Sequence, residues 1–200
     1  MPPGETLGAR LVRATELRSA PDGAVLSHMS TRTSFGSRRV LAVVSAPGPW
    51  LEVLSSTLPN GRSGWIRATD VTLLRETWSI DVDLSRRSMT LRHFDRPYRR
   101  MAVAVGATGT PTPPGRYAVT DRLRTGSPSS PYGCCVLALT GRQPNVPQDW
   151  DGGDRLAIHG TSDPASIGSA ASLGCIRASA DDMRLLMARV PLGTPVRIRA

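Results

Sequence analysis

Short apolar segments separated by turn-forming residues make up the first part of the chain. Turn signals stand at residues 21–23 (PDG), 47–49 (PGP) and 59–61 (PNG). Residues 50–53 (WLEV) alternate between apolar and polar, as in a half-exposed strand, and Asn60-Gly61 is typical of a hairpin turn. Short strands at this spacing predict a small β-barrel over residues 6–75. The expected strands contain residues 11–12, 25–26, 40–44, 50–54 and 65–66.

The remainder of the chain also has mainly strand patterns. Residues 78–84 (WSIDVDL) alternate cleanly, and residues 89–92 return as a hairpin partner. Residues 75–77 are expected to form a short hinge, which divides the chain into one domain over residues 6–75 and a second over 77–200. Further strands are predicted at residues 101–105, 116–119, 135–139, 155–159 and 195–198, with loops at 124–133 and 141–153.

One helix is predicted near the C-terminus. Ser179 is a good N-cap and Asp182 follows at the third helical position. A single buried face is then formed by Met183, Leu186, Met187 and Val190, at spacings i, i+3, i+4 and i+7. The fold class is therefore mainly β, with one firm helix in the second domain.

Composition and charge narrow the classes of function. The net charge is +9, and all 25 basic residues counted as Lys or Arg are arginine. The arginines are scattered, which disfavours nucleic-acid binding and favours attraction to an anionic polymer such as the cell wall. No window of about 18 apolar residues exists, so no membrane span is expected. The first ten residues, MPPGETLGAR, lack a signal-peptide pattern.

The cysteines and histidines hold the candidate chemistry. Cys134 and Cys135 start an apolar strand, and neighbouring cysteines rarely bridge, so we expect them to be structural and not disulfide-bonded. The spacing of cysteines and histidines indicates no zinc site. His28 and His93 lie in polar surroundings and have no predicted role.

Cys175 and His159 form the most specific candidate site. His159 ends a predicted strand and is followed by Gly160, whereas Cys175 follows Gly174 in a loop of small residues. A thiolate is the reactive form of cysteine, and an imidazole can take the thiol proton. Each residue also has an ordinary interpretation: a lone cysteine is often a small buried apolar residue, and a lone histidine often has only a structural hydrogen bond. Their polar, glycine-rich setting favours a Cys–His acyl-transfer site.

These residues resemble the catalytic signature of the L,D-transpeptidase family. The resemblance covers about residues 77–200 and implies a β-sandwich that has the cysteine on a loop below a variable lid. The motifs that carry it are HGT at 159–161, IG at 167–168, SLGCIR at 172–177, IDVDLS at 80–85, TPPGRY at 112–117 and GTPV at 193–196.

The resemblance implies a reaction on peptidoglycan stem peptides. Cys175 would attack the bond before the terminal D-alanine of a donor stem, and His159, oriented through Gly160, would act as base and then as acid. The backbone N–H groups of Leu173, Gly174 and Cys175 would form the oxyanion hole. An amine of an acceptor stem would resolve the thioester into a cross-link, and no metal or organic cofactor would be needed.

The resemblance also implies the substrate-binding residues. Arg177 and Ser172 would position the donor, Arg177 as a carboxylate partner; Thr161 belongs to the same motif, and Tyr132 is either part of the donor groove or an ordinary loop aromatic. Many members have a second histidine where this chain has Leu173. His159 must therefore do the work of the base unaided.

The N-terminal segments LRSAP at 17–21, WLEV at 50–53 and GWI at 64–66 resemble a bacterial SH3-like domain. Such domains are credited with holding wall-modifying enzymes to peptide or wall. Trp50 and Trp65 are expected in the barrel core, with a ligand platform as the alternative.

Three other functions stay open at this point. Water in place of the amine would make the chain an L,D-carboxypeptidase. A cysteine peptidase or amidase of the papain type would have Cys before His, whereas here His159 precedes Cys175. A wall-binding protein without activity is the third alternative. The substrate implies an extracytoplasmic, wall-associated location, although no export signal is visible.

Overall fold

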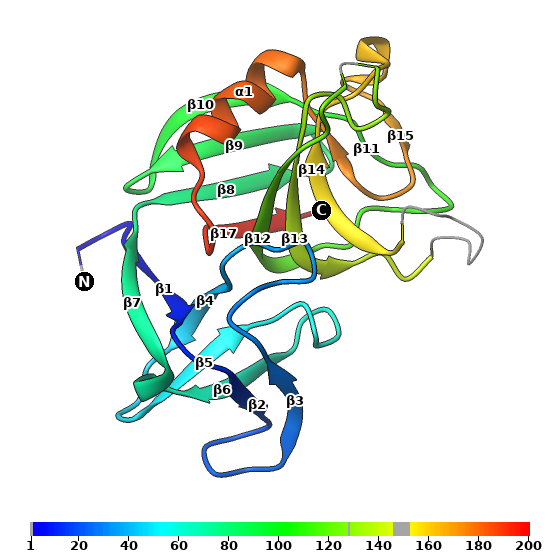
Figure 1. The fold of residues 1–200 in the computed structure, drawn as a ribbon. Coiled ribbons are helices and arrows are strands. Elements are labelled where there is room, and N and C mark those ends of the chain that lie inside the picture. Colours follow the sequence, from blue (N-terminus) through cyan, green and yellow to red (C-terminus); the bar gives the residue numbers. More distant parts are fainter. Residues whose placement is uncertain (1, 128, 146–152) are drawn as a thin grey trace.

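Two β-sheets follow one another along the chain in the computed structural model, which describes residues 2–127, 129–145 and 153–200. The first sheet contains residues 6–76 and the second contains residues 78–199 (Figure 1). Part of the predicted loop at 141–153 lies outside the described residues. Within the described part of the chain, no helix has the length and apolarity that a membrane crossing needs.

The first sheet has seven strands in the order β3-β2-β6-β5-β4-β1-β7. Antiparallel pairing of sequence neighbours is frequent, as expected for strands joined by tight turns. Their alternate side chains form a separate core that includes Leu17, Leu51 and Ile66. The strands are β1 (Thr6–Leu11), β2 (Thr15–Arg18), β3 (Val25–Met29), β4 (Val40–Ser45), β5 (Trp50–Leu54), β6 (Ser63–Arg67) and β7 (Val71–Glu76), and a 3₁₀ turn (Ala68–Asp70) precedes β7.

The predicted hinge at residues 75–77 is wrong. Arg75 and Glu76 belong to β7 and pair with Leu7 and Thr6 of β1. The next residue, Thr77, accepts a hydrogen bond from the Phe94 N–H at 2.8 Å. These ladder bonds hold the junction in place, which residue composition alone did not indicate.

The second sheet has eight strands in the order β10-β9-β8-β17-β12-β13-β14-β16. The long strand β12 connects two halves of this sheet. It pairs with β17 at its start and with β13 further along, and the sheet folds over on itself at this strand. A short pair, β11 with β15, lies beside it. The strands are β8 (Trp78–Asp83), β9 (Ser88–His93), β10 (Arg96–Ala102), β11 (Val105–Gly106), β12 (Gly115–Arg124), β13 (Cys135–Arg142), β14 (Arg155–His159), β15 (Ala170–Ser172), β16 (Ile176–Arg177) and β17 (Pro195–Arg199).

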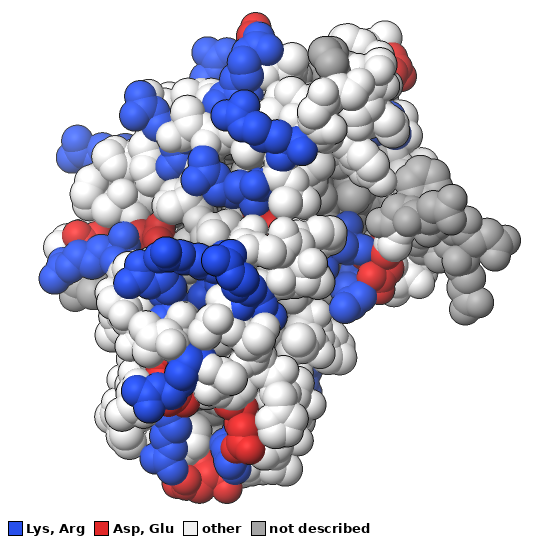
Figure 2. Space-filling view, viewed as in Figure 1, with Lys and Arg blue, Asp and Glu red and all other residues white. Residues whose placement is uncertain are grey.

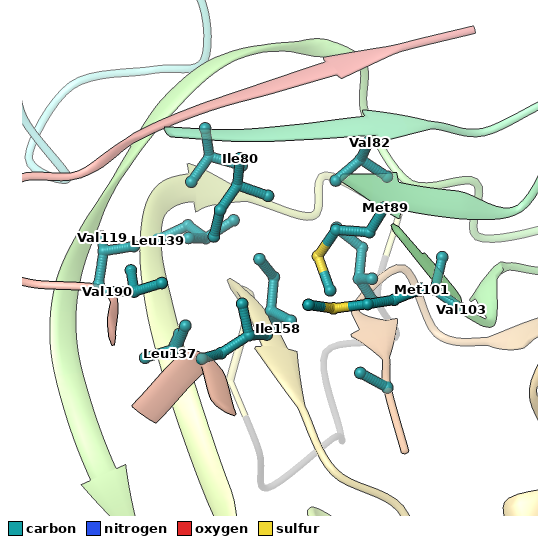
Figure 3. Close-up of a cluster of buried hydrophobic side chains, with 14 of the residues drawn as sticks. Ile80, Val82, Met89, Met101, Val103, Val119, Leu137, Leu139, Ile158 and Val190 are labelled. Atoms are coloured by element: carbon teal, nitrogen blue, oxygen red, sulfur yellow. The ribbon is translucent and has the colours of Figure 1, made fainter. Parts of the chain in front are cut away.

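The main core lies between the two halves of this folded sheet. Figure 3 shows Ile80 and Val82 facing Leu137, Leu139 and Ile158 across the layer. These side chains are 0–1% exposed, so their burial supplies the main hydrophobic stabilisation of the domain. The alternation seen in residues 78–84 thus corresponds to one buried face of β8.

Strand boundaries differ from the prediction at two places. The strand predicted at residues 101–105 begins earlier, at Arg96, and ends at Ala102, with Val105 in a separate short strand. The loop of small residues between His159 and Cys175 contains β15 and a 3₁₀ turn (Pro164–Ser166). The arginines and the proline of β10 obscured its strand pattern, and β15, with three residues, is too short to show a period.

The predicted helix is α1 (Ala180–Arg189), with Ser179 as its N-cap. The Ser179 Oγ accepts a hydrogen bond from the Asp182 N–H at 3.1 Å and donates to Asp182 Oδ2 at 2.8 Å. Met183 and Leu186 are fully buried in the main core. The helix packs against β13, and its Asp182 lies 3.4 Å from Arg99 of β10.

Replacing this cap is expected to weaken the domain. Ser179→Ala leaves the Asp182 N–H without its side-chain acceptor and should lower the free energy of unfolding by about 1 kcal/mol. Urea unfolding followed by circular dichroism measures the change. Ser179→Asn keeps a capping oxygen and should stay close to the wild type; equal losses in the two variants would contradict the assigned role of the cap.

Candidate active site

Two parallel strands bring the candidate nucleophile and base together. β14 pairs with β16 so that His159 lies opposite Arg177, and Cys175 directly precedes β16. Cys175 and His159 line the same cavity, which has a volume of about 430 Å³. Residues that the sequence separates by a loop therefore meet at one edge of the sheet.

The His159 ring is held in a defined orientation. Its Nδ1 lies 2.5 Å from the Gly160 carbonyl oxygen, so Nδ1 carries the proton and donates it to that oxygen. Nε2 is then the unprotonated nitrogen, as a general base requires. The Tyr132 ring packs edge-on against the imidazole with the ring centroids 5.0 Å apart.

Burial keeps both groups of the pair neutral. It lowers the pKa of His159 to about 4; the hydrogen bond to Gly160 opposes this shift, and the charge of Arg177 adds to it. Burial also raises the pKa of the Cys175 thiol, while the main chain at Ala157 and the charge of Arg177 lower it by less. The nearby cation thus does not produce a standing thiolate, and the thiol proton has to leave during the attack.

The loop before the nucleophile is tied by Ser172. The Ser172 Oγ accepts a hydrogen bond from the Gly174 N–H at 3.0 Å and donates to the Cys175 carbonyl at 2.5 Å. Gly174 has a φ of 117°, a conformation that side chains disfavour. The Ser172 hydroxyl is thus engaged within the loop, although the residue lines the cavity, and the Gly174 N–H, one of the three predicted oxyanion donors, already has an acceptor. Leu173 and Cys175 remain the candidate oxyanion donors.

A second set of contacts fixes Gly174 from the other side. The buried Thr112 Oγ1 donates to the Gly174 carbonyl at 2.8 Å and accepts from the Gly106 N–H at 2.9 Å. The buried Gln143 amide donates to the Pro111 carbonyl at 2.8 Å, and a Cβ built at Gly174 would lie 2.0 Å from that amide nitrogen. The sequence analysis assigned no role to Thr112 or Gln143. The TPPGRY motif contains Thr112 and could have indicated its role, whereas no local signal marks Gln143.

The remaining predicted site residues separate into two groups. Tyr132 and Arg177 line the cavity. Thr161 is not among the lining residues; its Oγ1 accepts from the Asp163 N–H at 2.9 Å and donates to the Asp163 carbonyl at 3.2 Å. That Thr161 binds substrate stays a prediction; in this structure its hydroxyl is engaged in its own turn.

Cys134 and Cys135 form a disulfide with each other, contrary to prediction. The chain turns at Gly133, which has a φ of 60°, and enters β13 immediately afterwards. The Cys134 and Cys135 carbonyls accept hydrogen bonds from the N–H groups of Thr125 and Gly160. We predicted no bridge because disulfides between neighbouring cysteines are rare, and this pair is an exception.

Cys175 is the free cysteine of the described residues. Its Sγ lies 3.8 Å from the Arg155 carbonyl oxygen, inside the cavity. Within residues 2–127, 129–145 and 153–200, no three His, Cys, Asp or Glu side chains are grouped as metal ligands would be. The chemistry that the described side chains offer is that of a thiol beside a neutral imidazole.

Comparison with known proteins identifies relatives of the second domain. The family model of the YkuD L,D-transpeptidase catalytic domain matches residues 77–198. The chain is 35% identical to YkuD of Bacillus subtilis over 121 residues, which make up 60% of this chain and 65% of that protein. It is 31% identical to YqjB of the same species over 107 residues, or 48% of this chain and 57% of that protein. The matches thus span less than two thirds of these curated relatives.

Solved structures share the fold at low sequence identity. An L,D-transpeptidase from Mycobacterium tuberculosis H37Rv has a TM-score of 0.53 and 18% identity, covering 81% of this chain and 90% of that one. L,D-transpeptidase 3 from the same species, in complex with a faropenem-derived adduct, has a TM-score of 0.51 and 17% identity over 81% of this chain and 91% of that one. At these identities the likeness establishes the mainly β fold with its sandwich.

Proposed function

The chain belongs to the L,D-transpeptidase catalytic-domain family, and on this premise we propose that it transfers peptidoglycan stem peptides through a thioester on Cys175. The observation that carries the proposal is the shared cavity of Cys175 and His159. The Gly160 carbonyl fixes the imidazole with Nε2 unprotonated. A neutral thiol and a neutral base in one desolvated site are suited to acyl transfer.

The first half of the reaction forms the acyl-enzyme. As the Cys175 sulfur bonds to the scissile carbonyl carbon, the thiol proton passes to Nε2 of His159. The N–H groups of Leu173 and Cys175 stabilise the resulting oxyanion. When the carbonyl re-forms, the bond to D-alanine breaks and its amine takes the proton from His159. The products are a thioester on Cys175 and free D-alanine.

The second half transfers the acyl group to an amine of an acceptor stem. His159, neutral again, takes a proton from the attacking amine, and the thiolate that leaves recovers a proton from the imidazolium. The net result is a new amide bond and a regenerated enzyme. The protein side chains carry every proton in this cycle, which requires no redox step.

The charges around the cavity suit a peptide with free carboxylates. Arg124, Arg155 and Arg177 line it together with a single described acidic residue, Asp154. Arg177 lies opposite His159 in the sheet register and is a candidate partner for a donor carboxylate. Figure 2 shows arginine side chains on both domains of one face, with acidic side chains between them. This distribution is compatible with an anionic wall polymer.

We propose that residues 6–75 form an SH3-like domain that holds the enzyme to the cell wall, and that residues 77–200 form the catalytic domain at an extracytoplasmic site. The short antiparallel strands and the separate core of the first sheet support this division. Trp50 is 5% exposed, with the Arg67 guanidinium 4.0 Å from its ring centroid, which favours a core role for this residue over a ligand platform. Trp65 is partly exposed.

The acceptor distinguishes a transpeptidase from the alternative, an L,D-carboxypeptidase. Incubation of the full chain with a purified tetrapeptide stem should release D-alanine and give a cross-linked dimer, because in the proposed second half-reaction an acceptor amine resolves the thioester. Mass spectrometry of the products measures both. Tripeptide without dimer would assign hydrolysis, and no release of D-alanine would refute both activities.

A further inference from the structure

The loop that joins β3 to β4 crosses from the first domain to the catalytic domain. This crossing loop, residues 30–39, lies beside β12 and β13 in Figure 1. Thr33 Oγ1 in the loop donates a hydrogen bond to Asp121 Oδ1 on β12. The first domain therefore contacts the strand that carries one wall of the catalytic cavity.

The crossing loop is ordered by its own hydrogen bonds. The Thr33 N–H donates to the Ser37 carbonyl at 2.9 Å, and the Gly36 N–H donates to the Thr33 carbonyl at 3.0 Å. Arg32 Nη1 adds a bond to the Gly36 carbonyl at 2.6 Å, and Gly36 has a φ of 84°, as a tight turn requires. Phe35 lies at the tip of this turn, so the backbone sets its position.

Asp121 anchors the loop from the catalytic side. Its side chain is fully buried, and Oδ2 has no hydrogen-bond partner in the part of the chain that the structure describes. Burial lowers the pKa of Arg39 and of Arg155, and the charge of Asp121 opposes this shift in both. A carboxylate buried near a guanidinium from each domain would lose a hydrogen bond if the loop moved away, which favours the docked position.

The docked loop puts Phe35 on the wall of the active-site cavity. Phe35 lines the cavity that contains Cys175 and His159, yet its side chain is 51% exposed. The neighbouring lining includes Leu123 and Pro131, so the rim beside it is apolar. A large aromatic side chain placed at such a rim would bury further surface when a ligand enters.

We propose that Phe35 is a substrate-binding residue of the catalytic site, which makes the first domain part of the active site and not only a wall-binding module. The proposal rests on the proposed function. Phe35 covers the aliphatic side chain of a donor-stem residue next to the scissile bond, while the cavity arginines hold the carboxylates. The ring lowers the free energy of the bound peptide without touching the proton transfers at Cys175.

The test measures D-alanine release by the full chain from a tetrapeptide stem. Phe35→Ala should lower kcat/KM on the order of 10-fold, mainly by raising KM, because part of an aromatic contact is lost. Phe35→Tyr keeps the ring and should restore most of the value. Val12→Ala is the matched control, since Val12 is also 51% exposed in the first domain and does not line the cavity.

Two further measurements distinguish a loss of substrate binding from damage to the active site. The rate at which iodoacetamide alkylates Cys175 should be the same in Phe35→Ala and the wild type, because this small reagent does not need the apolar rim. Thr33→Val removes the hydrogen bond to Asp121 and, like Phe35→Ala, should raise KM. Equal kcat/KM values for Phe35→Ala and wild type, or a loss confined to kcat, would overturn the proposal. Wild-type protein that releases no D-alanine would instead refute the proposed function, and this inference with it.

Discussion

Cys175→Ala should abolish D-alanine release from a tetrapeptide stem, with a fall in kcat on the order of 10⁴-fold or more. In the proposed mechanism the Cys175 thiol forms the bond to the acyl group, and the described cavity contains no second cysteine that could replace it, since Cys134 and Cys135 are joined to each other. Loss of the nucleophile removes the covalent route and leaves only binding and the oxyanion donors. Release of D-alanine measured by a coupled assay reports the change.

Covalent labelling gives a second readout of the same substitution. A carbapenem should add to the wild type once, and intact-mass measurement should show no adduct on Cys175→Ala. Cys175→Ser keeps the volume and a hydrogen bond but has a much less nucleophilic oxygen, so it should also be nearly inactive while folding normally. A Cys175→Ala protein that keeps wild-type turnover would show that another residue is the nucleophile.

His159→Gln should reduce kcat/KM by about 10²- to 10⁴-fold. The side-chain amide can still contact the Gly160 carbonyl, but it cannot take the thiol proton during the attack. Because burial raises the pKa of Cys175, the variant has little thiolate at neutral pH and cannot bypass the missing base. The loss should shrink at alkaline pH, where hydroxide generates the thiolate without help.

The pH profile of the wild type tests the same assignment. With its pKa lowered to about 4, His159 stays neutral as pH falls through 6.5, the ordinary value, and protonates only near pH 4. The acidic limb of kcat/KM should therefore lie near pH 4, and His159→Gln should lack it. An acidic limb near 6.5 in the wild type would contradict a desolvated imidazole, and an unchanged limb in the variant would assign it to another group.

Stability should follow the same titration. The folded protein holds His159 with a lowered pKa, so the unfolded chain binds a proton more readily as pH falls below about 6.5. This residue accordingly favours folding above that pH and opposes it increasingly down to about pH 4. His159 is thus a buried part of β14 as well as the proposed base.

Local signals were sufficient for much of the fold. The alternation in residues 78–84 predicted β8, and the apolar spacing after Ser179 predicted α1 with its cap. These features depend on neighbours within a few residues, so the sequence displays them directly. Predictions failed where pairing with distant strands decided the outcome, as at Arg75 and Glu76, which β1 draws into β7.

The sequence by itself determined the mainly β class, through its short alternating segments, and the family, through motifs such as SLGCIR and HGT, which also predict the pairing of Cys175 with His159. Only the tertiary structure decided which groups are free to act. In the fold, the Ser172 hydroxyl and the Gly174 N–H are hydrogen-bonded within the loop, and burial shifts the pKa values of Cys175 and His159 so that both groups are neutral. The tertiary structure also placed Phe35, from the other domain, on the cavity wall. Hydrogen-bond partners, desolvation and contacts between domains arise from atoms far apart in the chain, so no local pattern could show them.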